Sequence, residues 1–150
     1  MYTTVLAFHN IVRWVVLISG LLAAGKAIMG WLGKKSWTDI DNQFGLIFTI
    51  SMDVQLLLGL LLYFVLSPIT TQAFSDFGAA MADAGARFWA VEHIFTMIVA
   101  VALAHVGRSL SKKAPDALHK HQRAAIFFTI AILAILAAIP WSRPMFPAGF

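Results

Sequence analysis

The chain contains no cysteine and few charged residues. Of its 150 residues, 12% are charged and 60% are hydrophobic. The absence of thiols excludes disulfides, thiolate-held iron–sulfur clusters and covalent c-type haem attachment, so histidine, carboxylate and methionine remain as metal ligands. A soluble domain of this length would carry about one quarter charged residues. The composition therefore predicts a membrane protein.

Several catalytic motifs are also missing. The chain has no phosphate-binding glycine loop, no zinc-protease helix motif and no serine nucleophile elbow, so nothing supports hydrolysis or phosphoryl transfer. The net charge is +4. The basic residues cluster beside apolar stretches, where positive charge sets membrane topology. We therefore expect the lipid bilayer as a partner and no nucleic acid.

Four apolar stretches are present, and each reaches or approaches the ~20 residues that cross a bilayer. They cover about residues 5–31, 44–66, 88–110 and 124–140. The first is too long for a signal peptide and lacks a charged leader, so we expect a retained helix. Because the loops are short, the stretches predict one all-α domain over residues 1–150, a transmembrane four-helix antiparallel bundle. Stripes of small residues, such as Gly20, Ala24 and Ala27, predict close helix contacts.

The positive charges are distributed unequally between the two ends of the predicted bundle. Eight of the eleven Lys and Arg residues flank the first and third loops, and three belong to the other end. The eight are Lys26, Lys34, Lys35, Arg108, Lys112, Lys113, Lys120 and Arg123. The positive-inside rule then places these loops in the cytoplasm and both termini outside.

Two histidines lie at matching depths on separate predicted helices. His9 is about four residues inside the first helix and His93 about five residues inside the third, both counted from the outer end. A neutral imidazole in a bilayer is costly without a partner. A b-type haem needs two imidazoles that face each other from different helices. The pair therefore predicts a haem b site or another metal site, and the alternative is that each ring bonds water, lipid or a carbonyl.

Two arginines are candidates for binding the haem propionates, because guanidinium groups pair well with carboxylates. Arg13 follows His9 by four residues and so shares its helix face. Arg87 lies near the outer end of the third helix, where it alternatively extends its charge to the membrane surface. Asp53 and Glu92 are alternative partners for Arg13.

Two carboxylates are candidates for a proton relay. Asp53 lies near the middle of the second helix, where a carboxylate usually faces the bundle interior. It either pairs with Arg13 or is protonated and hydrogen-bonded, and we favour the ion pair. Glu92 precedes His93 and either orients an arginine or accepts a proton from a quinol at the outer surface.

The other three histidines belong to the opposite half of the bundle. His105 lies twelve residues beyond His93, and His119 and His121 lie in or beside the third loop. A second haem at the depth of His105 is one alternative. We favour a titratable, lipid-facing basic rim that includes His119, Lys120 and His121.

Several stretches resemble a family of small four-helix bacterial inner-membrane proteins, mostly uncharacterised and sometimes labelled cytochrome b-like. The stretches are FHNIVRW, QLLLGLLLYF, RFWAVEH, a GRS…KK run and the closing AIPW. The resemblance covers nearly the whole chain, implies a bacterial inner membrane and draws attention to His9, Arg13, His93 and Arg108. The chain lacks the paired histidines on one helix that the large respiratory cytochromes b share, which argues against two stacked haems.

Three functions follow as hypotheses. The first is membrane electron transfer through one b-type haem between the first and third helices, with a quinone as a potential electron partner. The second is a non-catalytic accessory subunit of a larger respiratory or photosynthetic complex, or of a homo-oligomer. The third is a proton or small-solute pathway through Asp53, Arg13 and His93.

Overall fold

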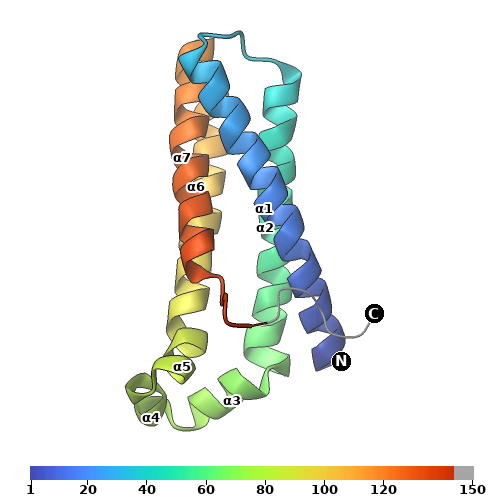
Figure 1. Cartoon of the computed structure of the whole chain (residues 1–150), viewed down its shortest axis with the longest axis vertical. Coiled ribbons are helices and arrows are strands. Elements are labelled where there is room, and N and C mark those ends of the chain that lie inside the picture. The colour runs from blue at the N-terminus through green and yellow to red at the C-terminus, as the bar shows by residue number, and fades with distance from the viewer. Residues whose placement is uncertain (144–150) are drawn as a thin grey trace.

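The protein is all-α. The computed structural model describes residues 1–143, and this part of the chain contains helices and no strand. Its four long helices are α1 (Tyr2–Leu32), α2 (Asp39–Leu61), α6 (His93–Lys112) and α7 (Ala117–Ala138) (Figure 1). All four belong to helical runs that are long and apolar enough to cross a membrane. The predicted fold class is therefore confirmed.

The helix ends follow local capping chemistry rather than hydropathy. At the start of α2, Asp41 accepts hydrogen bonds from the backbone and side chain of Thr38, at 2.8 and 2.6 Å. The α7 helix starts at Ala117, where Asp116 accepts a bond from the backbone of His119 at 2.9 Å. The apolar stretch predicted from residue 124 begins about two turns later, because the first turns of α7 are polar.

Two π-helical segments interrupt the second and third apolar helices. They are η1 (Leu62–Leu66), which continues α2, and η2 (Phe88–Glu92), which precedes α6. The Tyr63 hydroxyl donates to the carbonyl of Ala90 at 2.6 Å and so joins the two segments. Wide turns of this kind are frequent at functional sites.

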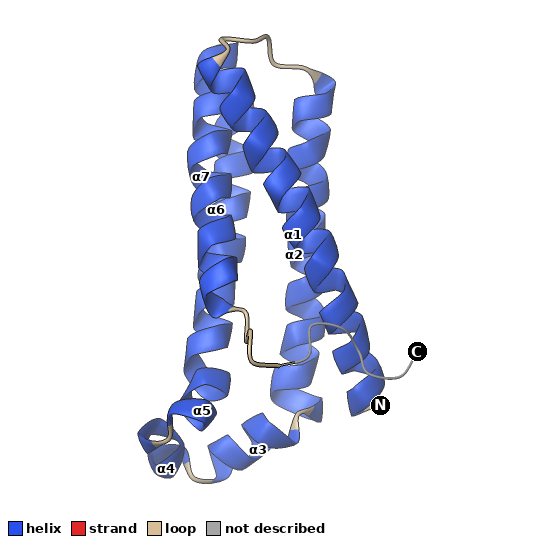
Figure 2. Ribbon diagram, viewed as in Figure 1, coloured by secondary structure: helices blue, strands red, loops and turns tan. Residues whose placement is uncertain are grey.

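Three short helices connect η1 to η2. They are α3 (Pro68–Ser75), α4 (Phe77–Ala82) and α5 (Ala84–Arg87), and they lie across one end of the bundle (Figure 2). The sequence predicts a short interfacial helix over residues 74–86, and the helical structure begins earlier, at Pro68, whose fixed φ suits a first helical turn. Phe74 and Phe77 are exposed beside acidic residues, as an interfacial segment requires.

The four long helices form a ring in which each contacts two neighbours. Helix α1 packs on α2 and α7, and α6 packs on the same two helices. Neighbours run antiparallel, so α1 and α6 are parallel and diagonally opposed (Figure 1). We call the end where α1 begins the terminal end, and the end with the α1–α2 and α6–α7 loops the basic end, because the eight basic residues lie there.

The best-packed part of the core lies toward the basic end. Gly20, Ala24 and Ala27 are buried on α1, as their spacing predicts. A Cβ atom on Gly20 would stand 2.7 Å from the Phe48 ring. That ring meets Phe128 edge to face, with centroids 5.5 Å apart. Small residues thus let α1, α2 and α7 approach closely in this half.

Candidate functional site

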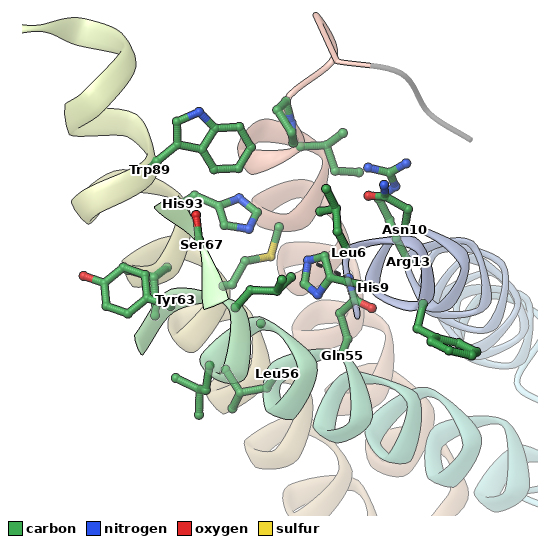
Figure 3. Close-up of a pocket in the computed structure, with 18 of the residues that line it drawn as sticks. Leu6, His9, Asn10, Arg13, Gln55, Leu56, Tyr63, Ser67, Trp89 and His93 are labelled. Carbon is green, nitrogen blue, oxygen red and sulfur yellow. Dashed lines mark hydrogen bonds between the residues drawn. The ribbon is translucent and has the colours of Figure 1, made fainter. Parts of the chain in front are cut away.

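A cavity of about 780 Å³ occupies the terminal half of the bundle. It is lined by α1, by α2 and η1, by α6 and by the end of α7, and most of its side chains are apolar. Both predicted ligand histidines line it, His9 from α1 and His93 from the first turn of α6 (Figure 3). Its volume lies within the range of about 300–1,000 Å³ that is typical of cofactor and ligand sites.

The end of α7 orients His93. Pro140 cannot continue the helix, so α7 ends at Ala138 and its last carbonyls lack intrahelical partners. The Nδ1 atom of His93 lies 2.9 Å from the Ala138 carbonyl oxygen. A carbonyl only accepts, so Nδ1 carries the proton, and a neutral His93 ring presents the lone pair of Nε2 as a metal ligand. The rings of Phe88 and Trp89 each lie 5.7 Å from the imidazole and support it.

His9 lies on α1, the helix diagonally opposite α6, which carries His93. Its Nε2 is 3.2 Å from the side-chain amide of Gln55, and its Nδ1 is buried without a hydrogen-bond partner among the described residues. Gly59 of α2 faces the ring, and a Cβ atom there would stand 3.3 Å from His9 Cε1. The glycine therefore leaves room for the imidazole beside the cavity. The Gln55 bond joins α1 to α2 across the cavity wall, and helical spacing alone does not predict it.

The donor set fits a haem better than a bare metal ion. Within residues 1–143, no group of three or more His, Asp or Glu side chains is arranged to hold a metal. A protein-bound zinc or similar ion needs at least three protein ligands. A porphyrin supplies four nitrogens of its own, so the iron needs only two axial ligands. His93 Nε2 is engaged by no described residue, and neither is His9 Nδ1. His9 Nδ1 has a free lone pair only when Nε2 carries the proton, which requires the Gln55 side chain to present its oxygen rather than its nitrogen to Nε2.

Two arginines line the cavity, and one of them was not among the predicted site residues. Arg13 is 7% exposed and lies one helical turn beyond His9. Arg143 was counted from the sequence only among the three basic residues of the outer end. It also lines the cavity, and its guanidinium carbon lies 5.5 Å from the centre of the Trp89 ring. Arg143 follows the end of α7 closely, and its position depends on the turn at Pro140.

The structure does not bring Arg87 to the cavity. Its Nε donates to Glu92 Oε1 at 2.7 Å, and its Nη1 donates to the Met81 carbonyl at 3.2 Å. Five residues of α-helix would place Arg87 and Glu92 about 140° apart. The π turn of η2 between them brings them to one side. Glu92 thus orients an arginine, which is one of the two roles predicted for it.

Asp53 also lies outside the cavity. Its Oδ1 is 2.7 Å from His105 Nε2, so α2 and α6 are joined there, and both side chains are 47% exposed. The structure therefore gives Asp53 a different partner from the predicted Arg13. Arg13 and His93 line the cavity and Asp53 does not.

Each of the remaining histidines has a hydrogen-bond partner within the bundle. His119 is exposed and bonds Asp116 at 2.8 Å. His121 is only 1% exposed, with Nε2 3.3 Å from the Ser36 carbonyl and its ring packed against Gly30. The predicted lipid-facing basic rim is therefore wrong for His121, which is a core residue at the basic end. His105 bonds Asp53, as described above, so these contacts give no support to a second haem.

Comparison with protein-family models, with curated proteins and with solved structures finds no match. The fold and the cavity nevertheless define a class of protein, a four-helix bundle of membrane-spanning length whose interior presents two histidines from diagonal helices. Any assignment of function to this chain rests on the geometry of that cavity.

Proposed function

We propose that the protein binds one b-type haem between His9 and His93 and transfers electrons in the membrane. One observation carries the proposal: two imidazoles from diagonally opposed helices line a single, mainly apolar cavity of cofactor size. Diagonal helices of a bundle can place ligands on opposite faces of a flat macrocycle, and the interior excludes water from it. When bound, haem supplies a one-electron carrier whose potential depends on its axial ligands and surroundings.

The chain itself would hold and tune this group. The Ala138 carbonyl accepts the Nδ1 proton of His93, which fixes the ring orientation and raises the basicity of Nε2. On the side of the cavity opposite His93, Gln55 holds the His9 ring by a hydrogen bond. Arg13 and Arg143 supply two cations, which suits the two propionates of a haem. In this proposal Arg143, and not the predicted Arg87, binds the second propionate.

Charge asymmetry supports the proposed orientation. The eight basic residues surround the basic end, and the cavity lies toward the terminal end, where the residues at the start of α1 line it. The positive-inside rule then places the cavity under the outer face of the membrane. The resemblance to small bacterial inner-membrane proteins, some of them labelled cytochrome b-like, agrees with that location.

A membrane quinol is the electron donor that we propose. One quinol molecule would reduce the ferric haems of two protein chains, one electron each, and would release two protons as it becomes the quinone. The Glu92 carboxylate is half-exposed, immediately precedes His93 and is paired with Arg87 outside the cavity, so it would accept a proton from a quinol at the membrane surface. A haem-loaded protein should therefore be reduced by a soluble quinol analogue, and Glu92→Gln should slow this reduction more than reduction by dithionite.

The haem proposal is tested by optical spectroscopy. The protein, produced with a haem supply and purified in detergent, should show a reduced-minus-oxidised haem b spectrum. His9→Ala and His93→Ala should each abolish or shift it. His119→Ala is the matched control, because that ring is exposed and bonds Asp116 far from the cavity. A folded protein that stays colourless after haem addition would contradict the proposal.

A further inference from the structure

The Asp53–His105 pair lies at the outer surface of the bundle, at the depth of the membrane interior. Asp53 lies fourteen residues after the start of α2 and thirteen before Leu66. At ~1.5 Å per residue it is about 20 Å from either end of that helical run. Both side chains are 47% exposed, and neither lines the haem cavity. An isolated copy would therefore present two ionisable groups to the hydrocarbon core, which is costly.

The surface around this pair has the character of a helix-packing face. On α2, Ile50 and Leu57 are exposed at the spacing that places them beside Asp53, and Val54 is exposed on the adjoining side of the helix. On α6, the exposed stripe through His105 includes Ala102 and Ser109, whose small side chains permit close approach of another helix. We call this surface the α2–α6 face.

The hydrogen-bonding groups of the pair are self-complementary. Asp53 uses Oδ1 and His105 uses Nε2 in their mutual bond. Among the described residues, Asp53 Oδ2 and His105 Nδ1 make no hydrogen bond. One copy therefore offers one acceptor and one ring nitrogen. A two-fold axis beside the pair would bring the carboxylate of each copy to the imidazole of the other.

We propose that the protein forms a two-fold symmetric dimer in the membrane through the α2–α6 face, with the two Asp53–His105 pairs at its centre. The dimer removes four ionisable side chains from lipid and gives the pairs additional partners. It does not depend on haem, because neither residue of the pair lines the cavity.

The absence of cysteine makes a cross-linking test direct, because each variant carries a single thiol. Ile50→Cys, Leu57→Cys and Ala102→Cys probe the α2–α6 face. Leu22→Cys on α1 and Leu133→Cys on α7 are matched controls, since both residues are more than half exposed elsewhere on the bundle. After oxidation in native membranes, at least one face position should give a species of twice the chain mass at fivefold or more the yield of the controls. Equal yields at all five positions would overturn the proposal.

A second experiment isolates the polar pair. In the best cross-linking background, Asp53→Asn should lower the dimer yield severalfold, and the exchange Asp53→His with His105→Asp should restore it. The mass of the purified protein–detergent complex, from light scattering, should follow the same order. A monomer in both wild type and exchange variant, or cross-links only to a different protein, would overturn the dimer. The haem spectrum should stay unchanged throughout, so failure of this proposal and failure of haem binding are distinguishable.

Discussion

Glycine has opposite effects on packing in the two halves of the bundle. Toward the basic end, Gly20, Gly30 and Gly107 allow neighbouring helices and rings to come together, and added Cβ atoms would overlap them. Toward the terminal end, Gly59 makes room beside His9, and a cavity of about 780 Å³ remains between the helices. The difference indicates that the packed half stabilises the bundle, whereas the open half leaves room for a ligand.

The largest expected effect comes from filling the open half. Gly59→Phe places an aromatic ring at the His9 side of the cavity and should weaken haem binding about a hundredfold, equivalent to ~2.8 kcal/mol. The thermal stability of the haem-free protein should change little, because no well-packed contact is lost. Haem titration in detergent measures the first quantity and thermal unfolding the second. Val65→Phe, on an exposed position of the same helical run, should affect neither.

Adding bulk to the packed half should do the reverse. A Cβ atom on Gly107 would overlap the Cβ of Phe127, which cannot move without its backbone. Gly107→Val should therefore lower the free energy of unfolding by about 1–3 kcal/mol, as overpacked cores do. Gly25→Val is the control, because a Cβ there meets nothing within 4 Å. Equal unfolding midpoints for the two variants would refute the distinction between the halves.

The end of α7 provides a smaller, more specific effect. Pro140→Ala allows α7 to continue, so the Ala138 carbonyl becomes available to a backbone N–H and its bond to His93 weakens. Loss of such a supporting bond typically costs 10–100-fold in metal affinity, and we expect about tenfold here, because the histidine itself remains. A shift of the haem reduction potential should accompany it. Pro115→Ala, between α6 and α7 at the basic end, should leave both affinity and potential unchanged.

Arg143 should contribute less, because it is exposed. Arg143→Gln should weaken haem binding by up to about fivefold, the range of a solvent-exposed ion pair of up to ~1 kcal/mol. The effect should shrink as salt concentration rises. Arg87→Gln is the informative comparison, since Arg87 bonds Glu92 instead of lining the cavity. If Arg87→Gln weakens binding more than Arg143→Gln, the placement of the propionates is wrong.

The smallest effect concerns acid sensitivity at the start of α7. Hydrogen bonds from the backbone and ring of His119 hold the pKa of the Asp116 carboxyl below its ordinary value of 3.8. A lowered pKa means that this capping contribution is present above the ordinary value and disappears as the pH falls through the lowered one. Hydrogen exchange of the first turn of α7 should therefore accelerate below about pH 4. In Asp116→Asn the amide oxygen still caps the helix but does not titrate, so that acceleration should be absent.

Hydropathy was sufficient to predict the four long helices, because each apolar stretch must leave water. It was insufficient for the start of α7, where His119, Lys120 and His121 form polar first turns. The start of α7 is instead indicated by its N-capping residue, Asp116. The burial of His121 depends on Gly30, ninety-one residues away, and no local pattern reveals such a contact.

The candidate site was partly predictable from the sequence. Depth along a helix can be counted, so the sequence indicated that His9 and His93 lie at similar levels, and the structure places both at one cavity. The partners of Arg87 and Tyr63 depend on π turns, which shift the helix face in a way that α-helical spacing does not reveal. Gln55 and Arg143 reach the cavity through tertiary packing and the turn at Pro140.

The most direct test of the central claim is the axial ligation of haem in the purified protein, measured by electron paramagnetic resonance and near-infrared magnetic circular dichroism. We expect one haem per chain, low-spin in the ferric state, with two imidazole ligands. His9→Ala and His93→Ala should each remove that signature. A haem that stays low-spin with two imidazole ligands in both variants, or a folded protein that binds none, would show that His9 and His93 are not the axial ligands.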